Sequence, residues 1–206
     1  MSKPFTKNHL PVFPLNTVIF INGTLQLKIF EQRYLNMIKT CMQNQHGFIS
    51  VLIREGKEVA DIPEIYTTGT YVNIIDWNTL DNNLLAITIQ GHQRVQINKT
   101  HVQDDNLISA EIDYLENLKL NEADIIDDDL LALLQSLQSH PFVAAKYPDI
   151  DIHDILDIAY KLSELLPIAS PIKQSLLEAS QTRILIDMLK TIISQLENLS
   201  VNTDLP

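Results

Sequence analysis

The chain has 206 residues, of which 45% are hydrophobic and only five are glycine, and its formal net charge is −11. This length and composition fit one large or two small globular domains with a real core, and they argue against a low-complexity chain. A surface this acidic repels a phosphate backbone on average, so nucleic acid is not an expected partner.

Cysteine content and hydropathy indicate the cellular compartment. Cys41 is the only cysteine, which excludes an intrachain disulfide and favours a reducing compartment. No apolar run reaches the roughly 18 residues that a membrane-spanning helix needs, and Pro11 and Pro14 interrupt the apolar stretch near the start. We therefore expect a cytosolic protein with no secretory signal and no membrane partner.

The first half of the chain has the pattern of a β-rich domain with one helix. Residues 17–21 (TVIFI) are β-branched or aromatic and predict a strand. An Asn-Gly turn then leads to residues 24–30, where apolar and polar side chains alternate as in a half-buried strand. Within residues 31–45 the apolar side chains fall at helical spacing, and Gly47 ends the pattern.

More strands are predicted before the helical part of the chain. They are residues 48–54, 69–77, 84–91, 94–98 and 107–115. Gly91 separates two of them and predicts a bulge or bend.

After about residue 118 the apolar period becomes helical. Asn121 is a predicted N-cap for a helix from Glu122. An apolar stripe between Ile155 and Leu166 predicts a second helix, and residues 181–199 predict a third. We therefore expect a β-rich subdomain over residues 1–118 and a helical one over residues 119–206.

The sequence gives little support for known catalytic motifs. A nucleotide-binding P-loop is absent, because Val51 stands where the first glycine before Gly56-Lys57 should be. Ser170 and Lys173 match a short Ser-x-x-Lys pattern, but Ser170 followed by a proline is better explained as a helix N-cap. Cys41 lies on the apolar stripe of the first helix, which favours a buried and inert thiol.

Metal and cofactor sites are not expected. His153 with Asp149 and Asp151 could hold a cation in principle, but the start of a helix explains these polar residues as well. The acidic run 127–129 lacks the glycine and the final glutamate of a calcium loop, and is predicted as a solvated helix face.

Several ordered motifs resemble the amino-terminal, substrate-binding domain of Lon protease. The matching residues are Leu10-Pro11, Phe13-Pro14-Leu15, Ile29-Phe30-Glu31 with Arg33-Tyr34, Gly69-Thr70 with Ile74, Ile89-Gln90-Gly91 with Arg94-Val95, and Lys173-Gln174 with Leu176-Leu177-Glu178 and Arg183. The similarity extends over about residues 9–197. Ile21-Asn22 stands where the family commonly has a proline.

The resemblance implies both a fold and a role. It implies an α+β fold, with a PUA-like β-barrel subdomain that contains one helix, followed by an α-helical bundle. In full-length Lon this region helps to recognise unfolded or tagged proteins, and the ATPase and protease domains lie downstream. We therefore expect a stand-alone, non-catalytic module for protein quality control whose partners are unfolded or tagged polypeptides, with a protease or a chaperone as further candidates.

A candidate peptide-binding groove follows from the same motifs. Its residues are Phe20, Ile21, Trp77, Gln90, Gln93 and Arg94. The apolar members either fill the core or line a groove for an extended apolar peptide, and apolar residues at strand period favour the core. Arg94 either contacts a peptide backbone or pairs with a carboxylate inside the domain, and the second reading is preferred.

Two other functions stay open at this point. One is a hydrolase with an unrecognised site, for which Ser170 is the first candidate. The other is an RNA-binding module, suggested by the PUA-like architecture and opposed by the acidic charge. The sequence leaves the oligomeric state open.

Overall fold

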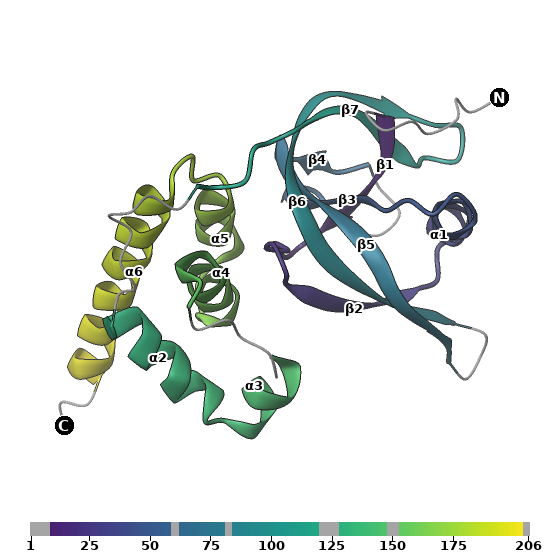
Figure 1. The fold of residues 1–206 in the computed structure, drawn as a ribbon. Helices are drawn as coiled ribbons and strands as arrows, with labels where there is room; N and C mark the ends of the chain where they lie inside the picture. Colours follow the sequence, from purple (N-terminus) through teal and green to yellow (C-terminus); the bar gives the residue numbers. More distant parts are fainter. Residues whose placement is uncertain (1–8, 59–61, 81–83, 120–127, 148–152, 204–206) are drawn as a thin grey trace. The chain divides into compact units, whose positions relative to one another are not determined.

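The computed structural model describes residues 9–58, 62–80, 84–119, 128–147 and 153–203 (Figure 1). The chain divides into two compact units, Met1–Asn117 and Leu118–Pro206, each of which is described by itself. The first unit combines strands with one helix and the second is helical, so the predicted α+β class is confirmed.

The strand unit is built on a closed ring of five strands (Figure 1). Its elements are β1 (His9–Leu15), β2 (Thr24–Ile29), α1 (Gln32–Gln43), β3 (Phe48–Glu55), β4 (Glu64–Ile65), β5 (Thr68–Thr79), β6 (Leu85–Val102) and β7 (Ile108–Tyr114). Around the ring, β1 pairs with β7, β7 with β6, β6 with β5 and β5 with β3, and β3 closes the ring by parallel pairing with β1. β2 adds to β6, and the short β4 adds to β3. The predicted barrel with one helix is therefore confirmed.

The ring strands bury side chains on both faces. Val12 and Phe13 are consecutive in β1, yet Val12 belongs to one apolar cluster and Phe13 to another. The cluster inside the ring consists of Leu10, Val12, Ile49, Val51, Val95, Ile97, Ile108, Ala110 and Ile112. Because successive side chains of a strand point to opposite faces, β1 contributes to both cores and carries no polar face.

The second cluster packs beneath α1. The helix contributes Tyr34, Met37, Ile38 and Cys41 to it, at the helical spacing seen in the sequence. The Tyr34 ring stacks on Phe13 with 4.1 Å between the ring centroids. The predicted burial of Cys41 is confirmed.

Residues 17–21 do not form the predicted strand. This segment has no strand assignment, and an individual side-chain hydrogen bond contacts its backbone. The Thr70 hydroxyl donates to the Ile19 carbonyl at 2.6 Å. The chain also passes close to β6, where a Cβ on Gly91 would lie 2.0 Å from the Phe20 carbonyl oxygen. A glycine is therefore required at that contact.

β6 runs without interruption through the two strands predicted on either side of Gly91. Its register with β5 shifts there, because Tyr71 faces Gln93 whereas Val72 faces Gly91. This shift confirms the predicted bulge.

The helical unit contains α2 (Asp128–Gln138), α3 (Pro141–Lys146), α4 (Ile155–Leu165), α5 (Ser170–Leu177) and α6 (Thr182–Thr203). α4 packs against α2, α5 and α6. The predicted helix start at Asn121 and Glu122 lies outside the described residues. The N-cap of α5 is Ala169, so Ser170 is the first helical residue and not the predicted cap.

Among the described helices, none has both the length and the apolar character needed to cross a bilayer.

Candidate functional site

A surface pocket of about 400 Å³ lies where α1 ends beside β5. Its lining residues are Cys41, Met42, Gln45, His46, Asn73, Ile74, Ile75, Asp76 and Trp77. Three of the large apolar side chains around it are exposed to solvent, namely Met42, Ile75 and Trp77. An exposed apolar group of this kind is typical of a binding surface.

The turn after α1 forms one wall of the pocket. Gln45 takes a left-handed conformation with a φ of 53°, which reverses the chain at the helix end. The Gly47 amide then donates to the Tyr71 hydroxyl at 2.7 Å, which ties the turn to β5. A Cβ on Gly47 would lie 1.8 Å from the Val72 carbonyl oxygen, so this close approach requires a glycine. The wall is thus fixed by contacts on both sides of the turn.

The other wall is β5. Its register with β6 shifts between Ile74 and Asp76, which leaves Ile75 as the extra residue of a bulge. Ile75 is 53% exposed and Trp77 is 55% exposed. Both side chains therefore leave apolar surface of β5 accessible to a ligand.

The six residues of the predicted groove do not meet at this pocket. Of the six, Trp77 alone lines it. Phe20 is fully buried, and Ile21 is half-buried beside the turn before β2. We conclude that Trp77 has the position expected of a groove wall, whereas Phe20 is a core residue.

The three polar residues of that prediction lie along β6. Gln90 is opposite Thr24 in β2. The Gln93 side chain donates to the Leu115 carbonyl at 3.1 Å. Arg94 is buried and donates to the backbone carbonyl of Glu116 at 3.1 Å, an acceptor within the same unit. Its pairing with a carboxylate stays a prediction.

Two features of the pocket were not predicted as site residues. Met42 belongs to the apolar pattern of the first helix but is exposed at its last turn. Ile74-Ile75 places two large apolar residues side by side in a strand, which breaks the alternation and marks the bulge. Both signals are present in the sequence.

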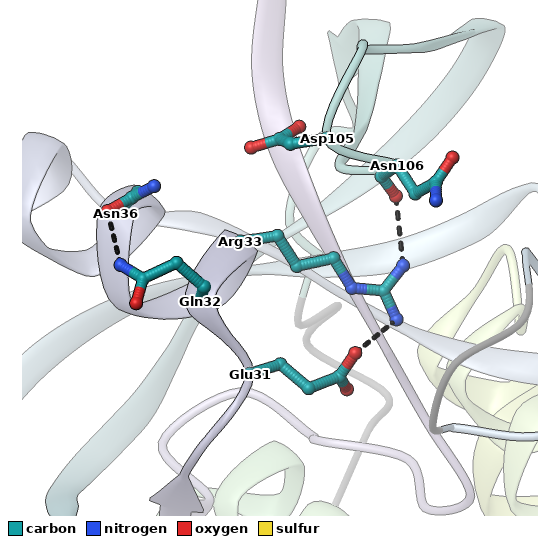
Figure 2. A pocket seen from close by; sticks show the side chains of 6 residues that line it. All are labelled: Glu31, Gln32, Arg33, Asn36, Asp105 and Asn106. Atoms are coloured by element: carbon teal, nitrogen blue, oxygen red, sulfur yellow. Dashed lines mark hydrogen bonds and ion pairs between the residues drawn. The ribbon is translucent and has the colours of Figure 1, made fainter.

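A second cavity, of about 300 Å³, lies at the start of α1 (Figure 2). Arg33 is only 7% exposed there, and its Nη1 donates to the Asn106 carbonyl at 2.9 Å. Its Nη2 lies 2.9 Å from a Glu31 carboxylate oxygen, an ion pair by distance without the alignment of a hydrogen bond. The guanidinium also lies 4.7 Å from the centre of the Tyr34 ring. These contacts join the start of α1 to the turn before β7, so the Glu-x-Arg-Tyr motif has a structural role.

Cys41 and Lys173, which were considered as catalytic residues, make contacts that stabilise the fold. Burial raises the pKa of the Cys41 thiol to about 12, which keeps it protonated and unreactive near neutral pH. The Lys173 ammonium donates to the Glu164 carbonyl at 2.6 Å, a contact between α5 and the end of α4.

The residues that the structure describes contain no group of three His, Cys, Asp or Glu side chains arranged to hold a metal ion. His153 is exposed, and Asp149 and Asp151 lie outside the described residues. Asp128 and Asp129 are exposed in the first turn of α2, as expected of a solvated helix face.

Comparison with known proteins identifies the family. A family model described as the ATP-dependent protease La (LON) substrate-binding domain matches residues 9–195. A Lon N-terminal domain protein from Xanthomonas campestris superposes with a TM-score of 0.74 at 24% identity, covering 89% of this chain and 97% of that chain. The N-terminal domain of the Mycobacterium avium complex Lon protease gives a TM-score of 0.62 at 13% identity, covering 88% and 98%.

No curated protein matches the chain. At these identities the two structural matches support the fold alone, whereas the family model matches almost the entire sequence. The chain therefore belongs to the family of Lon substrate-binding domains.

Proposed function

We propose that this protein binds unfolded or tagged polypeptide segments at the pocket between α1 and β5, without catalysing a reaction of its own. The observation that carries the proposal is the exposure of Trp77 and Ile75 together at the rim of one pocket, with Met42 exposed beside them. Tryptophan is enriched among the residues that contribute most to the affinity of protein–protein interfaces. The substrate-binding description of its family supports a polypeptide as the ligand.

The expected affinity is modest. Trp77 and Ile75 are already about half covered, so a ligand would bury only part of each side chain. Covering the rest contributes about 1–2 kcal/mol per residue, before the cost of ordering a flexible peptide. Dissociation constants in the micromolar range, which correspond to a binding free energy of about −8 kcal/mol, would suit a module that binds many unfolded chains.

The pocket residues favour a polypeptide over RNA. The lining contains one acidic residue, Asp76, and no lysine or arginine. A phosphate backbone would therefore gain no neutralising contact there. Bound segments would be transferred to a protease or a chaperone, in the reducing cytosol where the single thiol of Cys41 stays free.

A binding assay with one point change tests the proposal. Fluorescein-labelled peptides from unfolded proteins are titrated with the full chain, and binding is followed by fluorescence anisotropy. We expect Trp77→Ala to lower the affinity for the peptides that bind best by about tenfold or more. Phe30→Ala is the matched control, because Phe30 is also an exposed aromatic side chain (59%) of the strand unit and is not among the residues of the pocket.

Two outcomes would overturn the proposal. One is that no peptide or denatured protein binds at micromolar concentrations. The other is that Trp77→Ala and Phe30→Ala bind as tightly as the unchanged protein.

A further inference from the structure

β5 presents an open edge beside the pocket. β6 pairs with it from Thr68 to Thr79, but β3 pairs with its other edge only as far as Val72. Among the described residues no strand continues that edge from Asn73 onwards. The edge therefore starts at the pocket and extends to the end of the strand.

The direction of the backbone groups along this edge follows from one hydrogen bond. The Leu80 amide donates to the Leu84 carbonyl at 2.8 Å, which makes these two residues a hydrogen-bonded pair. In an antiparallel ladder such pairs alternate with pairs whose N–H and C=O groups point outward. Asn78 therefore bonds to β6, whereas the N–H and C=O groups of Trp77 and Thr79 point away from β6, toward the open edge.

This part of β5 is also uncovered on its faces. All five residues from Ile75 to Thr79 are exposed. Natural edge strands are commonly protected by a bulge or a charge, and β5 has both, in the bulge at Ile75 and the carboxylate of Asp76. These devices limit uncontrolled pairing but leave the outward groups of Trp77 and Thr79 available.

The charge of the molecule indicates what could add to the edge. A second copy of this chain would bring another net charge of −11 against the first. A foreign segment that carries a lysine or arginine would instead complement Asp76, the charged residue among those that line the pocket. Apolar side chains of the segment would face Ile75 and Trp77.

We infer that the bound polypeptide adds as a strand to the outer edge of β5 over residues 73–79, with an apolar side chain in the pocket and a basic residue near Asp76. This inference rests on the proposed function and specifies how the ligand binds. Backbone hydrogen bonds would provide affinity with little dependence on sequence, and the pocket would select apolar side chains. A module for unfolded chains needs that combination.

A scan with N-methylated peptides tests this geometry. The peptide that binds best is remade with one backbone nitrogen methylated at a time, which removes a donor without changing the side chain. Because only every second N–H of an added strand points to its neighbour, we expect binding to fall by about tenfold at alternate positions and to change little at those between. A lysine-containing peptide should also bind a few-fold more weakly to Asp76→Asn.

A proline in β5 provides the matching change in the protein. Proline is tolerated on an edge strand where its nitrogen faces away from the sheet. Thr79→Pro should therefore keep the far-UV circular dichroism spectrum of the unchanged chain but lower its affinity for the peptide by about tenfold. Thr79→Ala should bind the peptide as tightly as the unchanged chain.

The outcomes separate the two proposals. If methylation has the same effect at every position, or none, strand addition is wrong while polypeptide binding stands. If the unmodified peptide does not bind, the proposed function fails and this inference fails with it. If sedimentation shows a dimer that peptide does not dissociate and that Thr79→Pro does, the edge is occupied by a second copy and the inference is wrong.

Discussion

The two units of this protein bury charge in different ways. Among the described residues of the strand unit, the buried charged side chains are two arginines that donate to backbone carbonyls. Arg33, in the first turn of α1, donates to the carbonyl of Asn106, and Arg94, in the middle of β6, donates to that of Glu116. The two cores of that unit consist of hydrophobic side chains, and the small polar side chains of Ser50, Thr70 and Ser109 are also buried in the ring strands. Each arginine thus ties a connecting segment beside β7 to a helix or strand of the same unit.

Among the described residues of the helical unit, the buried charged side chains lie on α4, whereas the buried polar side chains of Gln174 and Thr182 lie on α5 and α6. Asp157, Lys161 and Ser163 of α4 are all buried. The Lys161 ammonium lies 4.7 Å from the centre of the Tyr147 ring. Burial, and secondarily the carboxylate of Glu164, raise the pKa of the Tyr147 hydroxyl.

This difference shows which unit is suited to hold a fixed apolar site. A closed ring with apolar cores on both faces resists deformation, so side chains that project from it keep their positions. The helical unit instead buries an acidic and a basic side chain, Asp157 and Lys161, on one helix. Each unit also has its own probe, since the only tryptophan, Trp77, is in the strand unit while helices dominate the circular dichroism signal.

The largest expected effect tests the apolar cores. Phe48 is fully buried in the cluster beneath α1, so Phe48→Ala should lower the free energy of unfolding of the strand unit by about 3–5 kcal/mol. Urea unfolding followed by Trp77 fluorescence measures the loss. Phe30→Ala, at an exposed position, should stay within about 0.5 kcal/mol of the unchanged protein. A loss below about 1 kcal/mol for Phe48→Ala would contradict tight packing in this core.

The next effect tests the polar centre of the helical unit. Lys161→Ala removes a buried cation from the Tyr147 ring, and any buried group that it neutralises loses its partner. We expect a loss of about 2–3 kcal/mol in the unfolding of the helices, followed by circular dichroism. Lys190→Ala, on the exposed side of α6, is the control. The comparison between the units fails if Lys161→Ala is as mild as Lys190→Ala.

The smallest effect concerns pH. The pKa of the Cys41 thiol is raised from 9.0 to about 12 in the folded chain, so above about pH 9 the unfolded chain loses this proton while the folded chain keeps it. Stability contributed by the thiol is therefore complete below about pH 9 and lost as the pH rises toward 12. At about pH 10 the loss is about 1 kcal/mol.

The buried phenol of Tyr34 acts in the same direction at a higher pH, because its pKa is raised from 10.0 to about 12. Urea unfolding of the strand unit at about pH 8 and about pH 10 measures the change. Cys41→Ala should reduce the difference between the two pH values. An equal difference in both proteins would show that the thiol is not the group responsible.

Local patterns in the sequence predicted most elements but not how they close into a ring. Alternation and period identified β2, β3, β5, β6 and β7, the first helix and the helices around α4 and α6, but not the two-residue β4. β1 was missed because Pro11 and Pro14 disfavour a strand, and because both of its faces are buried and it shows no alternation. Its parallel pairing with β3 joins residues far apart in the chain, which no local period encodes.

The candidate site was predicted only in part, for a similar reason. Trp77 could be placed at the end of a strand, but the choice between core and surface depended on where β3 stops pairing with β5. Phe20 was grouped with it because its segment is rich in β-branched residues. That segment is instead buried against Gly91 and held by the Thr70 hydroxyl.

The most direct test of the account is the emission of Trp77 during a peptide titration of the full chain. If a polypeptide binds at the pocket between α1 and β5, the emission should shift to shorter wavelength and become harder to quench with acrylamide, saturating at the same peptide concentration as the anisotropy signal. A peptide that saturates the protein while the emission and quenching of Trp77 stay unchanged would show that binding takes place elsewhere.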